Sequence, residues 1–376
     1  MKKFIYIPIY IFLYLFLLDK LFLIEPIRDK IVKNNFNYYE MIFQFGEKIF
    51  ETHTMKWLEK GLSLEEVENR TVMMLGTSRS EGYSELSESD IHGNPFVKDH
   101  ELLLKTPITS QHIRLGTFIL LYENYQNLIR KHPHLQLIAL ELNYGSFNSN
   151  TLSRQQKDID NLSWDQFRDA YEALSRKQVL DYIVSKLFIL NRYQVDFSLL
   201  FKKKDRTGEE AINDLFTLFR MLWSGSIQNQ IGEFKFEGIE EGKETQEQLD
   251  LYMNYSKSMN ASFYANYKTS TTDIKLFHKL VREAKEKNIP LIVYRPRIHK
   301  QFREVSDSYP HKELEWLKEQ KEFLSAHGIP FVDLEDPGSI RCNYYRDSSH
   351  LSKSCFPEIV EKFLEIRTKG LSSKIE

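Results

Sequence analysis

The distribution of apolar residues along the chain predicts an α/β fold. Short apolar runs with the length of buried strands alternate with segments in which apolar residues recur every three or four positions, as on one helix face. The strand-like runs are residues 72–75, 135–142, 291–294 and 331–334. Strands that alternate with helices are typical of a parallel sheet with helices on both faces. We therefore expect a doubly wound, three-layer α/β domain over residues 69–370.

The same pattern places the helices between the strands. A helix is predicted from about His112 to the residue before Pro133, after a loop over residues 81–110. Another runs from about His311 to Ala326, where Gly328 is a C-terminal stop signal, and Pro357 suits the first turn of the last helix. The alternation stops between residues 148 and 270. We expect a mainly helical insertion there, with helices over residues 180–200 and 212–223 and an exposed loop over 224–247.

The N-terminus carries a long apolar run. Residues 4–18 are uncharged, Lys2 and Lys3 precede them, and further apolar residues follow Asp19 and Lys20. As a helix, residues 4–24 would span about 31 Å, which matches a hydrocarbon core of about 30 Å.

No small-residue cleavage site follows the run, so an uncleaved transmembrane signal anchor over residues 1–24 is favoured over a cleaved signal peptide. A buried helix of a soluble protein is the remaining alternative. The two lysines predict a cytoplasmic N-terminus, with a helical stalk over residues 25–68 and the α/β domain outside the cytoplasm.

Candidate chemistry lies at two distant points of the chain. Ser78 stands in Gly-Thr-Ser directly after the first predicted strand, where open α/β sheets bind their ligands. A serine hydroxyl needs a base, normally an imidazole held by a carboxylate, to act as a nucleophile. Asp347 and His350 stand three residues apart in a loop before the last helix, a spacing that lets the carboxylate hold one ring nitrogen while the other faces a serine.

With these two motifs the chain resembles the SGNH, or GDSL-like, hydrolase superfamily. That superfamily has its serine in a G-D-S-like block after the first strand and its Asp and His in a D-x-x-H block near the C-terminus. The resemblance implies that Ser78 is the nucleophile, Asp347 the orienting acid and His350 the base. It also makes Asn143, which follows the second strand-like run, the candidate for the oxyanion hole. Thr77 stands where the superfamily has Asp, and the G-x-N-D block is absent.

The apolar N-terminus narrows the resemblance to membrane-anchored SGNH-like proteins of bacterial envelopes. This group includes the alginate O-acetylation proteins, the D-alanyl transfer protein of teichoic acid modification and a related uncharacterised family. The resemblance implies an esterase or O-acyltransferase of the bacterial cytoplasmic membrane that acts on an envelope polysaccharide or other acylated polymer. A transferase would also need a membrane acyl-carrier partner.

Two other function classes compete with this interpretation. A catalytically inactive SGNH-like scaffold that binds an envelope polymer or partner protein would explain Thr77 and the missing G-x-N-D block. A nucleotide-binding α/β protein is less consistent with the sequence, because no G-x-G-x-x-G or P-loop string follows a strand. Neither a cofactor motif nor a metal-ligand cluster is found, so no cofactor and no metal are expected.

Three further features of the sequence bear on partners, substrate binding and disulfide formation. A net charge of −2 gives no electrostatic reason to expect nucleic acid as a partner. Arg295 and His299 follow the 291–294 strand and are candidates for binding substrate, against the alternative of a solvated loop. Cys342 and Cys355, the only cysteines, bracket Asp347 and His350. In an oxidising compartment they are able to form a disulfide that holds this loop, the alternative being two buried thiols that never meet.

Overall fold

A computed structural model describes most of the chain, in ten stretches. They are residues 2–21, 24, 38–80, 82–112, 117–150, 158–159, 162–188, 238–264, 266–310 and 312–372. The chain divides into two compact units, one made of Met1–Ile42 with Ser153–Phe219 and the other of Phe43–Leu152 with Arg220–Glu376. The helix predicted over residues 212–223 lies outside the described residues, as do most of the stretch over 180–200 and of the stalk before residue 38.

The first unit contains the N-terminal helix α1 (Lys2–Lys20), together with α9 (Trp164–Ala170), the 3₁₀ turn η5 (Tyr171–Ala173) and α10 (Arg176–Leu187). Helices α9 and α10 both begin with a capping box, in which a serine side chain and a glutamine side chain satisfy each other's backbone amides. In the described part of the chain, no helix is both long enough and apolar enough to cross a membrane.

The second unit is built on a five-stranded parallel sheet. Its strands are β1 (Val72–Gly76), β2 (Ile108–His112), β3 (Leu137–Glu141), β5 (Leu291–Arg295) and β6 (Phe331–Asp333). Their order is β2-β1-β3-β5-β6, and every neighbouring pair is parallel. The predicted parallel α/β sheet is therefore confirmed. From β1 the chain adds β2 on one side of the sheet and then β3, β5 and β6 on the other, so the strand order has a topological switch point at β1. Open α/β sheets bind ligands in the crevice at such a point, outside the carboxyl ends of the strands.

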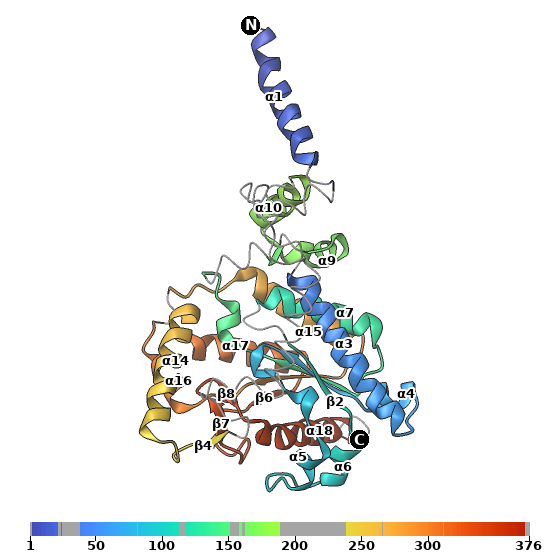
Figure 1. Cartoon of the computed structure of the whole chain (residues 1–376), viewed down its shortest axis with the longest axis vertical. Coiled ribbons are helices and arrows are strands. Elements are labelled where there is room, and N and C mark those ends of the chain that lie inside the picture. The colour runs from blue at the N-terminus through green and yellow to red at the C-terminus, as the bar shows by residue number, and fades with distance from the viewer. Residues whose placement is uncertain are drawn as a thin grey trace, which may run out of the picture. The chain divides into compact units, whose positions relative to one another are not determined.

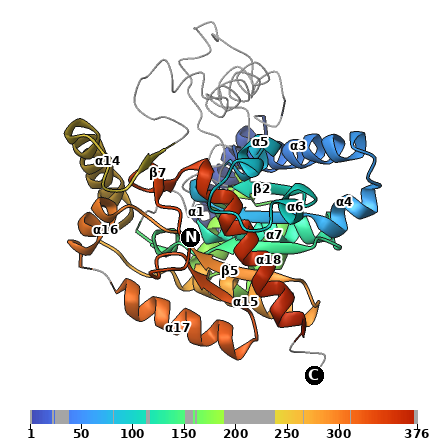
Figure 2. The same cartoon turned by 90° about the horizontal axis from the view of Figure 1, so that it is seen from below.

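Helices cover both faces of this sheet. Figure 1 shows α18 (Phe356–Ser372), α5 (Glu88–His92) and α6 (His100–Leu104) on one side and α7 (Phe118–Lys131) and α15 (Thr271–Glu286) on the other. Seen from below, α18 lies in front of the sheet (Figure 2). Because side chains alternate between the faces of a strand, β1 packs one set of residues against each helical layer.

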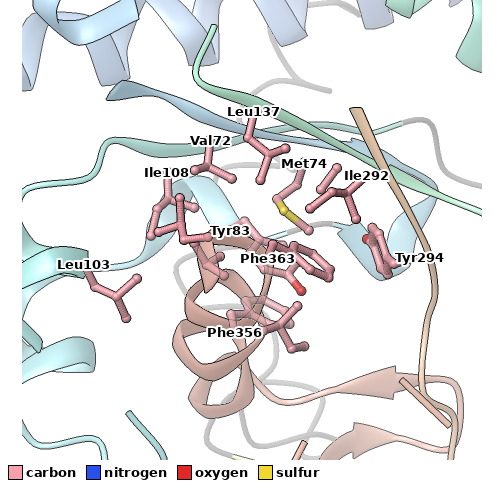
Figure 3. Close-up of a cluster of buried hydrophobic side chains, with 14 of the residues drawn as sticks. Val72, Met74, Tyr83, Leu103, Ile108, Leu137, Ile292, Tyr294, Phe356 and Phe363 are labelled. Carbon is pink, nitrogen blue, oxygen red and sulfur yellow. The ribbon is translucent and has the colours of Figure 1, made fainter. Parts of the chain in front are cut away.

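The layer under α18 is an apolar cluster in which strand residues meet aromatic side chains (Figure 3). Val72 and Met74 of β1 and Tyr294 of β5 point toward Phe356 and Phe363 of α18. Tyr83 stacks on Phe356 with ring centroids 4.0 Å apart. This packing fixes the start of α18, and with it the loop before α18 that carries Asp347 and His350.

The prediction was wrong about β2. Residues 81–110 were expected to be a loop and a helix was expected from His112, whereas β2 occupies Ile108–His112 and α7 begins at Phe118. The sequence of β2, Ile-Thr-Ser-Gln-His, lacks an apolar run. Its buried hydroxyls are satisfied instead by Ser84, whose Oγ lies 3.1 Å from both Thr109 Oγ1 and Ser110 Oγ. A strand whose polar side chains are paired in this way escapes a search for hydrophobic runs.

A second, three-stranded antiparallel sheet lies in the same unit. It has the order β4-β7-β8, with β4 (Ile239–Glu240), β7 (Tyr344–Asp347) and β8 (His350–Leu351). Strand β4 falls in the segment predicted as an exposed loop, and this pairing corrects that prediction. The β7–β8 hairpin carries Asp347 and His350, which were expected on an irregular loop.

The remaining helices of this unit lie around the two sheets. They are α3 (Tyr38–Glu59), which begins in the first unit, α4 (Leu64–Arg70), α14 (Gln246–Tyr264), α16 (Lys300–Asp307) and α17 (Glu313–Ala326). The predicted stop of α17 is confirmed, since Gly328 has φ +69°, a left-handed conformation that glycine adopts without a steric penalty.

Candidate active site

The serine turn follows β1 directly. Ser78 opens the short 3₁₀ turn η2 (Ser78–Ser80) at the carboxyl end of the strand. Gly76 allows the chain to turn there, because a Cβ at this position would lie 2.2 Å from Ser80 Oγ and 2.4 Å from Glu141 Oε2. Only a residue without a side chain fits that approach. The Gly-Thr-Ser sequence thus places Ser78 at the switch-point crevice of the sheet.

The buried carboxylate of Glu141 holds this turn from the neighbouring strand β3. It accepts hydrogen bonds from Thr77 N at 2.9 Å, Thr77 Oγ1 at 2.5 Å and Ser80 Oγ at 2.8 Å. Tyr294 OH lies 2.8 Å from Ser80 Oγ. An Asp in place of Thr77 would set a second carboxylate against Glu141, and like charges at that distance repel. The presence of Glu141 therefore gives a physical reason for threonine at the position where the SGNH pattern has Asp.

The β7–β8 hairpin supplies the other two groups. The carboxylate of Asp347 accepts hydrogen bonds from Ser349 N at 2.8 Å and His350 N at 3.0 Å, so it closes the tight turn between the strands. Both of its oxygens lie 2.8 Å from His350 Nδ1. Ser349 Oγ also lies 2.8 Å from this nitrogen. The imidazole is fixed in one orientation by these contacts.

The histidine and the serine then meet across 272 residues of sequence. His350 Nε2 lies 2.8 Å from Ser78 Oγ. Because an ionised carboxylate only accepts hydrogen bonds, we assign the proton of the neutral ring to Nδ1, which leaves Nε2 to accept from the Ser78 hydroxyl. The expected meeting of Ser78, His350 and Asp347 is confirmed, and its geometry is that of a nucleophile, a base and a group that orients the base.

The electrostatics keep Asp347 ionised. Burial alone would raise the pKa of this carboxyl, but the electrostatic interaction and the hydrogen bond with His350 outweigh it, assisted by Arg346 and the Ser349 amide. The pKa of Asp347 consequently lies well below its usual range. Arg346 Nε stands 3.7 Å from Asp347 Oδ2. A carboxylate that stays charged can stabilise the imidazolium that forms when His350 takes a proton.

Cys342 and Cys355 form a disulfide around the hairpin. Their Cα atoms are 5.3 Å apart and both residues are fully buried. The bridge joins the segment before β7 to the turn before α18, so it closes the chain around Asp347 and His350. Of the two alternatives that the sequence left open, a disulfide or two buried thiols that never meet, the structure has the disulfide.

A shallow pocket opens over the serine and the histidine. Most of its space is open to solvent, and seven residues line it. They are Ser78, Arg79, Arg346, His350, Leu351, Lys353 and Phe356. Ser78 and His350 therefore face this pocket, whereas Asp347 lies buried behind the imidazole.

A comparison with known protein families assigns nearly the whole chain to one family. A family profile described as "Protein of unknown function (DUF1574)" matches residues 1–366. The chain belongs to the DUF1574 family. A comparison with curated proteins finds no match. The match spans both the N-terminal segment and the α/β unit, so this DUF1574 chain combines the two in one family domain.

Asn143, the predicted oxyanion residue, caps a short turn in this DUF1574 chain. It precedes the 3₁₀ turn η4 (Tyr144–Phe147) after β3, and its side-chain oxygen accepts a hydrogen bond from Gly145 N at 3.1 Å. Asn143 therefore follows the strand next to β1, as expected. It is not among the residues that line the pocket, and its oxyanion role stays a prediction.

The structure does not bring Arg295 or His299 to the pocket. Arg295 lies in a buried ion-pair network, with Nη2 at 2.8 Å from Glu313 and 2.9 Å from Glu335. His299 is fully buried, with Nε2 at 2.8 Å from Glu244, and its Nδ1 accepts the amide of Gln301 to cap α16. Both side chains, expected to be available to substrate, are instead committed to partners within the fold.

Four residues of the DUF1574 site were missed from the sequence. Arg79, Arg346 and Lys353 line the pocket, and Glu141 holds the serine turn. For Glu141 a signal existed, because it is the one charged residue in the apolar run 135–142. A lone carboxylate in a buried strand requires donors at its end of the sheet. The three basic residues carry no such signal, since basic residues in loops are usually exposed.

Proposed function

We propose that this DUF1574 chain is an SGNH-type serine esterase or O-acyltransferase that acts on an acylated polymer of the bacterial envelope, a polysaccharide or a related polymer. The observation that carries the proposal is the contact of 2.8 Å between Ser78 Oγ and His350 Nε2, with Asp347 on the other ring nitrogen. Ser78 also stands at the sheet's switch point, where α/β folds bind ligands.

The proposed reaction runs through an acyl-enzyme. Ser78 Oγ attacks the ester carbonyl carbon while His350 Nε2 takes the hydroxyl proton, and Asp347 stabilises the resulting imidazolium. The tetrahedral intermediate collapses, and the alcohol leaves with the proton from Nε2. A water molecule or a polymer hydroxyl then gives its proton to Nε2 and attacks the acyl group. The products are a carboxylic acid or a new ester, and the proton returns to Ser78.

The location of the enzyme is part of the proposal. We place the N-terminus in the cytoplasm, residues 1–24 in the cytoplasmic membrane as an anchor and the α/β unit outside. This placement is supported by the apolar run of residues 4–18 after Lys2 and Lys3. The disulfide agrees with it, because such bonds persist in oxidising compartments. A transferase would draw its acyl group from a membrane acyl-carrier partner.

Ester hydrolysis by purified protein tests the proposal. Native protein should hydrolyse p-nitrophenyl acetate, and Ser78→Ala or His350→Ala should lower kcat by several orders of magnitude, because triad members act as a unit. Ser89→Ala, at an exposed serine outside the pocket, is the matched control and should leave the rate unchanged. Full activity in Ser78→Ala would refute the assignment. Polymer binding without any turnover that depends on Ser78 would favour the inactive scaffold.

A further inference from the structure

Three basic side chains share the pocket with the proposed nucleophile. Arg79, Arg346 and Lys353 line it beside Ser78 and His350, and none of the described lining residues is acidic. They come from three separate elements, since Arg79 follows Ser78 in η2, Arg346 lies in β7 and Lys353 begins the 3₁₀ turn η7 (Lys353–Cys355). With a net charge of −2 for the chain, this concentration of positive charge is a local feature.

Nearby carboxylates offset only part of this charge. Lys353 Nζ is paired with Asp90 at 2.7 Å, and Arg346 Nε stands 3.7 Å from Asp347, whose carboxylate is already bound to His350. Within the described residues, no carboxylate lies within ion-pair distance of Arg79. Among the described residues, the basic side chains that line the pocket therefore outnumber the carboxylates paired with them, and Arg79 accounts for the excess.

Arg79 is held so that its guanidinium tip remains available. Its Nε donates to the carbonyl of Ser349 at 3.0 Å, which ties it to the hairpin between Asp347 and His350. The guanidinium lies over the ring of Phe302, 5.6 Å from the ring centroid. A guanidinium fixed through Nε still presents its two terminal nitrogens, the fork that binds carboxylate or phosphate oxygens in pairs.

We propose that this pocket binds an anionic group of the substrate, a phosphate or a carboxylate, through Arg79, Arg346 and Lys353. This inference rests on the proposed function, because the anion would belong to the ester that Ser78 attacks. It defines the substrate class as an ester with a negative charge within a few bonds of its carbonyl. The cations also favour encounter with an anionic polymer over a neutral one.

A binding measurement on catalytically silent protein tests the site without reference to catalysis. Calorimetric titration of Ser78→Ala with inorganic phosphate, and separately with succinate, should show saturable binding. The ligand that binds more tightly shows whether the site prefers a phosphate or a carboxylate. Adding Arg79→Gln should weaken binding about tenfold, the loss expected for one charge-assisted contact. Lys318→Gln, at an exposed lysine of α17, removes the same charge elsewhere and should leave the affinity unchanged.

Because Arg79 also contacts the hairpin, a second variant separates the loss of charge from a disturbance of the serine turn. Lys353→Gln should also weaken binding, with an unchanged circular dichroism spectrum. In native protein, phosphate should compete with hydrolysis of the neutral ester p-nitrophenyl butyrate. If turnover depends on Ser78 but no anion binds, the anion site alone is overturned. The same holds if Arg79→Gln and Lys318→Gln lose the same amount of anion affinity. Anion binding lost in Arg79→Gln, without any turnover, would instead overturn the proposed function.

Discussion

At the scale of single residues, the site depends on carboxylates that are buried and saturated with hydrogen bonds. Asp347 accepts from His350 and from the backbone of its own hairpin, and Glu141 accepts from both ends of the serine turn. One carboxylate fixes the base and the other fixes the backbone that presents the nucleophile. Two long-range contacts, Ser78 with His350 and Glu141 with the serine turn, thus join β1, β3 and the hairpin into one site.

Asp347→Asn should lower kcat by about four orders of magnitude, because the neutral amide no longer fixes the reactive tautomer of His350. It should also change the pH dependence of stability. The folded-state pKa of Asp347 is lower than its unfolded value of about 3.9. The stabilisation is therefore present above about pH 4 and is lost as the pH falls toward the folded-state pKa. The difference in Tm between native protein and Asp347→Asn should shrink from pH 6 to pH 3, and a constant difference would contradict this electrostatic role.

Glu141→Gln tests the second carboxylate. A glutamine side chain has a single acceptor oxygen, so at least one of the donors on Thr77 and Ser80 would be left unsatisfied. We expect a loss of about 1–3 kcal/mol in the free energy of unfolding, together with a lower kcat as the Ser78 turn loosens. Chemical denaturation and ester hydrolysis measure the two effects. Unchanged stability and unchanged kcat would show that Glu141 does not position the turn.

The residues that could be predicted from sequence are those with a local signature. Ser78 stands after an apolar strand, and Asp347 and His350 have a spacing that brings a carboxylate to an imidazole. Arg79, Arg346 and Lys353 could not be found, because their function depends on three elements meeting at one pocket. For Arg295 and His299, the position after a strand did not predict a place in the pocket. Both side chains are buried and paired with glutamates that are distant in sequence.

At the scale of elements, the apolar strands and amphipathic helices were predictable and the polar or short strands were not. β1, β3, β5 and β6 have apolar sequences because helices cover both of their faces. β2 is polar and depends on Ser84. β4 and β8 have two residues each, and only tertiary contacts make strands of them. A pattern search over single segments cannot detect elements whose stability comes entirely from their partners.

The disulfide should stabilise the hairpin that carries Asp347 and His350. With a separation of 13 residues, the chain-entropy estimate for the bridge is about 3 kcal/mol. The double variant Cys342→Ser/Cys355→Ser should therefore unfold at lower denaturant concentration and lose activity while retaining the far-UV spectrum of the sheet. Free-thiol titration of exported native protein should find no thiol. Two titratable thiols would exclude the bridge in the exported protein.

At the scale of the whole molecule, the family match over residues 1–366 treats the N-terminal segment and the α/β unit as one domain. The proposed export predicts the accessibility of that unit. Protease added to spheroplasts of cells that express the protein should digest the α/β unit, while a cytoplasmic control protein stays intact. Protection of the unit under conditions where an external control is cut would reverse the proposed topology.

The most direct test of the central claim is covalent labelling of the nucleophile. Native protein treated with a fluorophosphonate probe should gain one adduct, which peptide mapping by mass spectrometry should locate at Ser78. Labelling should be abolished in Ser78→Ala and strongly reduced in His350→Ala, because the serine reacts only when its base takes the proton. An adduct that persists in Ser78→Ala, or native protein that remains unlabelled while a control serine hydrolase reacts, would contradict the proposed Ser-His-Asp chemistry.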